Sequence, residues 1–124
     1  FIFRGPKKTL SELIANNGIN AGVVLPNQKW YKSRKFFKPD AKLSVKIDNS
    51  VVASGSLWPT NGGPEDSLNW LKKNLIEFGI KLLPNHLILA GTALGLYPVE
   101  EGNEVALYID NILAVKCSIQ KNIA

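Results

Sequence analysis

The chain has 124 residues, of which 45% are hydrophobic and 20% charged, and a formal net charge of +5. These values are typical of one compact globular domain, here spanning residues 1–124. No apolar run approaches the roughly 18 residues that a membrane-spanning helix needs, and residues 1–8 lack the apolar region and cleavage site of a secretory signal. We therefore expect a soluble, single-domain protein that does not enter a membrane.

The single cysteine, Cys117, cannot form an internal disulfide. It lies in an alternating apolar segment, where a buried thiol is the usual occupant. A reducing cytoplasm is therefore the expected compartment.

Positive charge is concentrated in residues 1–46, which hold ten Lys or Arg against Glu12 and Asp40. Within residues 28–39, five of these cations alternate with four aromatic side chains. Such a loop could bind phosphates and stack on bases, so a basic nucleic-acid-binding module is one alternative. No helix-turn-helix, RRM or KH signature accompanies it, which argues against that function and favours a solvated loop with its aromatic residues turned inward.

The first elements are a short helix and a short strand. Thr9 and Glu12 form a capping box and Gly18 supplies a stop, which together predict a helix over residues 10–17. Residues 21–25 are an apolar run that ends at a proline. This run predicts a buried strand.

Two hairpins are predicted further along the chain. Apolar and polar residues alternate over 43–47 and again over 105–109, and each run ends at an Asp-Asn pair before apolar residues resume. Both hairpins contain the sequence Ile-Asp-Asn. Because Asp-Asn is a common turn pair, this likeness does not by itself require an internal duplication.

Between the hairpins, apolar residues at helical spacing over 68–78 predict an amphipathic helix, with Pro64 in its first turn and Gly79 at its exit. We expect this helix to lie against the sheet with one side in water. The fold class is therefore α+β, dominated by antiparallel strands, with two peripheral helices.

The chain offers few residues for catalysis. His86 is the single histidine and follows a Pro-Asn pair, which favours a surface turn residue over a general base. Glu100, Glu101 and Glu104 provide the oxygen ligands that Mg²⁺ or Ca²⁺ prefers. Their spacing matches no known metal loop, so a solvated acidic turn is the simpler interpretation.

The loop over residues 89–99 is the strongest candidate for a binding site. Gly91 and Gly95 free the backbone to approach a ligand, Thr92 offers a hydroxyl, and Pro98 fixes the exit of the loop. Backbone N–H groups and the hydroxyl could together hold a small anion. The alternative is a plain transition with no ligand, from the short buried strand expected after His86 into a turn.

The order of these motifs resembles the C-terminal half of the 2-keto-4-pentenoate hydratase branch of the fumarylacetoacetate hydrolase superfamily. Residues 68–119 contain the helix pattern WL-x-x-x-L-x-x-x-G-x-x-L, an apolar strand, Gly91-Thr92, Pro98-Val99 and a final turn. Residues 13–25 are similar to the family's A-D-N-A-S segment and the strand after it, with Ala15 and Asn17 matching.

The resemblance implies a mixed β-sandwich roll and a lyase that hydrates or decarboxylates small 2-oxo or 2-hydroxy-dienoic acids of aromatic catabolism. It also implies Mg²⁺ or Mn²⁺ at the 2-oxo acid, stabilising an enolate. Thr92 and Gly91 would line the substrate carboxylate region, and Asn17 would lie near the pocket edge. The family's metal-binding E-x-E pair has no counterpart here, since the single acid before residue 16 is Glu12.

Because these ligands are absent and the chain starts at Phe1 without an initiator Met, we expect the C-terminal half of a longer catalytic domain, inactive by itself. Exposed strand edges would then bind the missing N-terminal half or a second copy. A non-catalytic interaction domain with the same fold is the other alternative.

Overall fold

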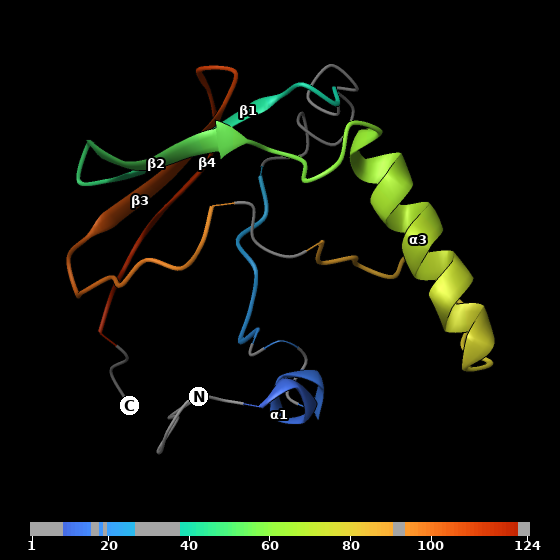
Figure 1. Cartoon of the computed structure of the whole chain (residues 1–124). Helices are drawn as coiled ribbons and strands as arrows, with labels where there is room; N and C mark the ends of the chain where they lie inside the picture. Colours follow the sequence, from blue (N-terminus) through green and yellow to red (C-terminus); the bar gives the residue numbers. More distant parts are fainter. Residues whose placement is uncertain (1–8, 16–17, 19, 27–37, 91–93, 122–124) are drawn as a thin grey trace.

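The computed structural model describes residues 9–15, 18, 20–26, 38–90 and 94–121. Its elements are α1 (Leu10–Ala15), β1 (Lys42–Ile47), β2 (Ser50–Ser56), α3 (Gly63–Glu77), β3 (Glu104–Ile109) and β4 (Ile112–Ser118). The four strands form one antiparallel sheet in the order β2-β1-β3-β4 (Figure 1). The expected α+β class, with antiparallel strands and two helices, is confirmed.

Each hairpin closes through a tight turn in which both central residues have positive φ. The φ values are 48° at Asp48 and 65° at Asn49, and 49° at Asp110 and 65° at Asn111. Asp and Asn tolerate this left-handed conformation, and such turns match the twist of the flanking strands. Both predicted hairpins are therefore confirmed.

The two hairpins correspond residue by residue at a constant offset of 62, as in Lys42 and Glu104. The backbone N–H of Asp48 donates to the carbonyl of Glu104 and that of Asp110 to the carbonyl of Lys42, each at 2.9 Å. In the β1–β3 ladder, Val45 pairs with its own counterpart, Leu107. The likeness thus extends from the turns to the strand register, which a common turn pair alone does not explain.

The sheet has one apolar and one polar face. Val45 and Leu107 share the apolar face with their neighbours two residues away, as expected for side chains that alternate along a strand. On the other face, the ammonium of Lys46 lies 4.7 Å from the ring centroid of Tyr108. Among the described residues, the buried hydrophobic side chains are Ala41, 1% exposed, and Ala106, 7% exposed. The apolar face is therefore incompletely covered.

The helix ends follow local sequence signals. The Thr9 hydroxyl accepts from the backbone N–H of Glu12 at 3.2 Å, and the Glu12 carboxylate accepts from that of Thr9 at 2.7 Å, which confirms the capping box. Helix α3 ends in a Schellman motif: Gly79, with φ of 67°, and Ile80 donate to carbonyls of the last turn.

Helix α3 does not lie against the sheet, contrary to the prediction. It leads away from the end of β2 and stands apart from the strands (Figure 1). Two of its large side chains face solvent: Trp70 is 66% exposed and Ile76 is 74% exposed. Amphipathic spacing predicted the helix correctly but could not determine which surface it packs against.

The two predicted short strands are also wrong. Residues 21–25 and 87–90 are neither strands nor buried, and Val24 is 55% exposed. A strand needs a neighbouring backbone to pair with, and the strand pairings of the described structure involve β1, β2, β3 and β4 alone. Cys117 is half-buried rather than buried. Neither helix in the described ranges is long and apolar enough to cross a bilayer.

Candidate functional site

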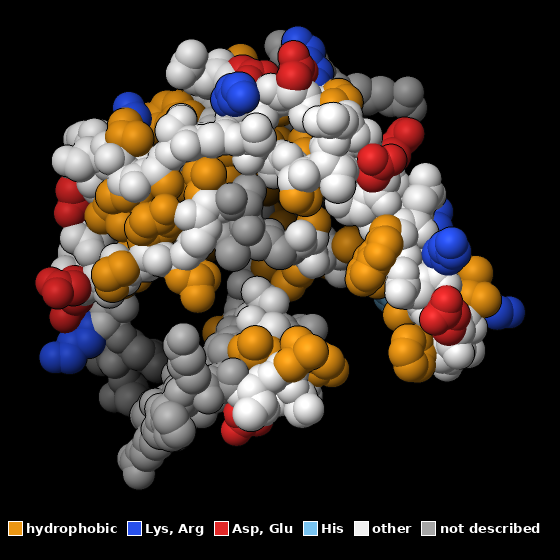
Figure 2. Space-filling model, viewed as in Figure 1, with side chains coloured by type: hydrophobic (Ala, Val, Ile, Leu, Met, Phe, Trp, Pro, Cys, Tyr) orange, Lys and Arg blue, Asp and Glu red, His pale blue; other side chains and the backbone are white. Residues whose placement is uncertain are grey.

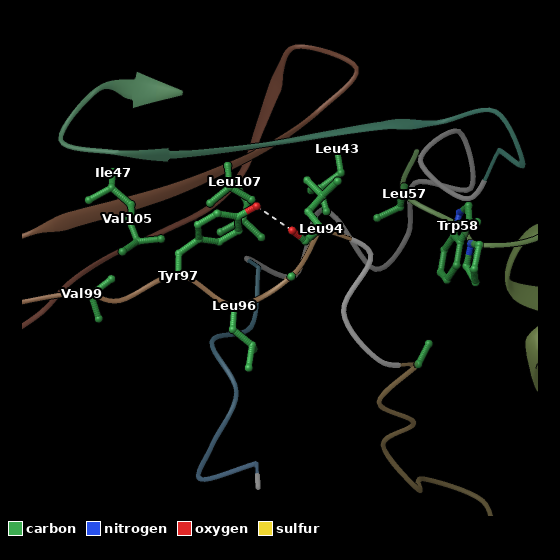
Figure 3. Close-up of a pocket in the computed structure, with 14 residues that line it drawn as sticks. Leu43, Ile47, Leu57, Trp58, Leu94, Leu96, Tyr97, Val99, Val105 and Leu107 are labelled. Atoms are coloured by element: carbon green, nitrogen blue, oxygen red, sulfur yellow. Dashed lines mark hydrogen bonds between the residues drawn. The ribbon is translucent and has the colours of Figure 1, made fainter. Parts of the chain in front are cut away.

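An open pocket of about 530 Å³ lies on the apolar face of the sheet. Hydrophobic side chains gather around this hollow in the space-filling view (Figure 2), and the close-up shows them converging from separate segments (Figure 3). Strands β1 and β3, the turn after β2, and the segment that leads into β3 all contribute. Its lining residues are Leu43, Val45, Ile47, Leu57, Trp58, Pro59, Ala90, Leu94, Gly95, Leu96, Tyr97, Val99, Val105 and Leu107.

The floor of the pocket comes from the two central strands. Val45 and Leu107 pair across β1 and β3, and Ile47 pairs with Val105 one step along the ladder. Directly paired side chains on one face of an antiparallel sheet are in contact distance. The alternating sequence of the two hairpins therefore makes the floor continuous and apolar.

Residues 94–99 cross over this floor and form the opposite wall. Leu94 packs on Gly55 of β2, where an added Cβ would come within 2.8 Å of the Leu94 Cδ2 atom. The Tyr97 hydroxyl donates to the Leu94 carbonyl at 2.6 Å, which closes the bend at Gly95, where φ is 97°. The glycine in β2 thus allows this segment to approach the sheet closely.

The turn after β2 forms the end wall. Leu57, Trp58 and Pro59 line the pocket there, and the Leu57 N–H donates to the Ala41 carbonyl at 2.8 Å. The indole Nε1 of Trp58 is buried and has no hydrogen-bond partner among the described residues. An unpaired buried donor costs about 1–3 kcal/mol, so this wall carries unused hydrogen-bonding capacity.

The pocket can accommodate hydrocarbon but offers little for acid–base chemistry. Among the described residues its lining includes no charged side chain, and the polar side-chain atoms on these walls are those of Trp58 and Tyr97. Within the described ranges, no group of three His, Cys, Asp or Glu residues is placed to hold a metal ion. The described walls are therefore suited to binding and to excluding water.

The predicted substrate-binding residues Asn17, Gly91 and Thr92 lie outside the described residues. Ala90 and Leu94, on either side of the Gly91-Thr92 pair in sequence, both line the pocket. The described part of the loop over residues 89–99 thus contributes Ala90 and most of residues 94–99 to the pocket.

The other candidates behave as surface residues. His86 lies in an exposed turn, where its Nδ1 accepts from the Leu83 N–H at 3.3 Å, which confirms the turn assignment. The N–H of Glu100 donates to the side chain of Asn103 at 2.6 Å. Glu104 pairs with Lys116 at 2.5 Å across the β3–β4 ladder, so it stabilises the sheet surface. Residues 28–37 of the basic loop lie outside the described residues.

Sequence reasoning missed the end wall, and it singled out the loop over residues 89–99 without predicting that residues 94–99 cross the sheet. Trp58 follows no periodic pattern, and a tryptophan does not mark a site by itself. The usable signal was Gly55, because a glycine inside a strand often marks the close approach of another segment. Its partner, Leu94, is distant in sequence and could not be inferred.

No family model, curated protein or solved structure matches this chain.

Proposed function

We propose that the chain is a hydratase-like domain that acts on small 2-oxo or 2-hydroxy-dienoic acids, by hydration or decarboxylation, in the cytoplasm. The proposal includes the mixed β-sandwich roll of the fumarylacetoacetate hydrolase superfamily, of which the four-stranded sheet would be one part. The observation that carries it is the position of Ala90 and Leu94, which flank the Gly91-Thr92 pair and line the pocket.

The character of the pocket supports this substrate class. A short dienoic acid has an unsaturated hydrocarbon chain and one polar end. The floor formed by Val45 and Leu107 suits the hydrocarbon chain, since burying apolar surface contributes about 25 cal/mol per Å². The acid group would lie toward the Gly91-Thr92 pair, where backbone N–H groups can hold an anion.

The described residues do not fit the Mg²⁺ or Mn²⁺ that such chemistry requires. No suitable group of three His, Cys, Asp or Glu side chains occurs among them, and the pocket walls that they form carry no carboxylate. A hard divalent cation needs several oxygen ligands, usually including carboxylates. We therefore propose binding without turnover for this chain alone, and we assign no catalytic step to its residues.

Titration with 2-oxopentanoate, followed by methyl resonances of labelled protein, tests the proposal. We expect shifts at Leu94 and Leu107, and weaker binding in Leu107→Phe, because the larger ring fills the pocket. The matched control is Leu113→Phe: Leu113 lies on β4, is not among the lining residues and is exposed. Absence of binding, or equal binding by both variants, would contradict the proposal.

A second candidate, a non-catalytic interaction domain, is favoured by the exposed apolar side chains. Trp70, Ile76 and Phe78 are all largely exposed on or just after α3. Exposed apolar patches of this kind often mark protein-binding surfaces. This function predicts a defined oligomer or partner complex and no thermal stabilisation by 2-oxo acids with Mg²⁺, and a clear stabilisation would count against it.

A further inference from the structure

A second hollow, of about 440 Å³, lies between the first half of α3 and residues 88–90 (Figure 1). Its apolar walls are Trp70 and Leu71 of the helix and residues 88–90 of the segment that returns beside it. Among the described residues, Ala90 alone lines both this hollow and the pocket on the sheet. The volume lies within the range of small-molecule sites, about 300–1,000 Å³.

The polar side chains of this second hollow are those of Thr60, Asp66 and Ser67, at the start of α3. The carboxylate of Asp66 folds back over Gly62, where an added Cβ would collide with its Cγ atom. The glycine therefore leaves the space that the carboxylate occupies, beside the turn that precedes the helix. The Thr60 hydroxyl donates to the Gly63 carbonyl at 3.4 Å, so its oxygen remains able to accept. One carboxylate and two hydroxyls thus offer acceptors in one hollow.

Asp66 makes this hollow negative in a chain whose net charge is +5. It is the single charged side chain among the described lining residues. Within the described ranges, the ion pair joins Lys116 and Glu104, and no cation lies within ion-pairing distance of Asp66. The N-terminus of a helix contributes only about half a positive charge nearby. The hollow therefore attracts a cation.

A primary ammonium group matches these contacts better than other cations do. It carries one positive charge and three N–H donors, which suit one carboxylate and two hydroxyls. The indole of Trp70 is largely exposed and offers an aromatic face, which attracts cations. A quaternary ammonium has no N–H to donate, and a divalent metal ion needs more oxygen ligands than these three groups supply.

We propose that this second hollow binds a primary amine on a short hydrocarbon chain. The ammonium group lies among Asp66, Ser67 and Thr60, and the hydrocarbon chain lies between Leu71 and residues 88–90. The proposal involves neither 2-oxo acids nor the floor of the pocket on the sheet, so it stands or falls separately from the proposed function.

Titration with n-butylammonium chloride at constant ionic strength, followed by methyl resonances of labelled protein, tests the proposal. We expect saturable shifts at Leu71 and Leu89, and none at Leu107, which lines the pocket on the sheet instead. 1-Butanol has the same hydrocarbon chain without the charge and should bind about fivefold more weakly. Butyltrimethylammonium, which lacks N–H donors, should also bind more weakly than n-butylammonium.

Two variants test the assigned contacts. Asp66→Asn should raise the dissociation constant of n-butylammonium about fivefold, because it removes the charge. The matched control is Glu65→Gln: Glu65 is an exposed carboxylate in the same helical turn that is not among the lining residues, so the constant should stay within about twofold. Trp70→Leu keeps an apolar wall but removes the aromatic ring, and should raise the constant about threefold. Circular dichroism checks that the variants fold.

Several results would overturn the proposal. These are the absence of saturable binding, equal binding of 1-butanol and n-butylammonium, and equal effects of Asp66→Asn and Glu65→Gln. Shifts confined to Leu107 would also overturn it, because they would place the amine in the pocket on the sheet.

Discussion

The carboxylate of Asp48 should contribute more to stability than that of its counterpart, Asp110. Its Oδ1 accepts from the backbone N–H of Glu104 at 2.8 Å, and its Oδ2 accepts from the side chain of Asn103 at 2.7 Å. The carboxylate of Asp110 accepts one such bond, from the backbone N–H of Lys42 at 2.9 Å. Each aspartate links its own turn to the start of the other hairpin.

The expected magnitudes follow from these contacts. A hydrogen bond of this kind contributes about 1 kcal/mol net, and alanine in the left-handed conformation costs about 1 kcal/mol. Asp48→Ala should therefore lower the free energy of unfolding by about 3 kcal/mol and Asp110→Ala by about 2 kcal/mol. The difference of about 1 kcal/mol reflects the extra bond to Asn103.

Urea denaturation followed by circular dichroism measures these free energies, provided that unfolding is two-state. Asn49→Ala and Asn111→Ala are the controls, because both residues have a φ of 65° and the structure records no side-chain hydrogen bond for either. They should each cost about 1 kcal/mol. Equal losses for the two aspartate variants, or control losses as large as that of Asp48→Ala, would refute the reasoning.

Three further changes test individual features. Gly55→Ala should displace the Leu94 methyl groups and weaken 2-oxopentanoate binding, because the new Cβ would lie 2.8 Å from Leu94 Cδ2; unchanged methyl shifts would contradict this. Thr9→Ala should destabilise the helix over residues 10–15 by about 1 kcal/mol. Carbon chemical shifts of these residues should show the lower helix content. This substitution should leave the free energy of global unfolding unchanged, since α1 has no buried residue. Gly63→Ala should lower the melting temperature, because Gly63 is buried and has a φ of 66°. Alanine in this left-handed backbone conformation costs about 1–2 kcal/mol. An unaltered melting temperature would contradict the expected backbone strain at this position.

The candidate site was only partly accessible from sequence. The predicted site residues Gly91 and Thr92 lie outside the described residues, whereas Ala90 before them and Leu94 after them line the pocket. Trp58 was missed, and the position of residues 94–99 over the sheet was not predicted, because pocket walls depend on which segments meet in space. A local sequence pattern carries no information about which distant segments come into contact.

The sequence by itself determined the elements whose interactions are local. Alternating residues and Asp-Asn turns specified both hairpins, and the capping box and Gly79 specified helix ends, because each involves residues a few positions apart. Only the tertiary structure decided that β1 pairs with β3, that α3 stands away from the sheet, and that residues 21–25 form no strand. These outcomes depend on shape and on available strand edges across long sequence separations, and a local apolar pattern is compatible with more than one of them.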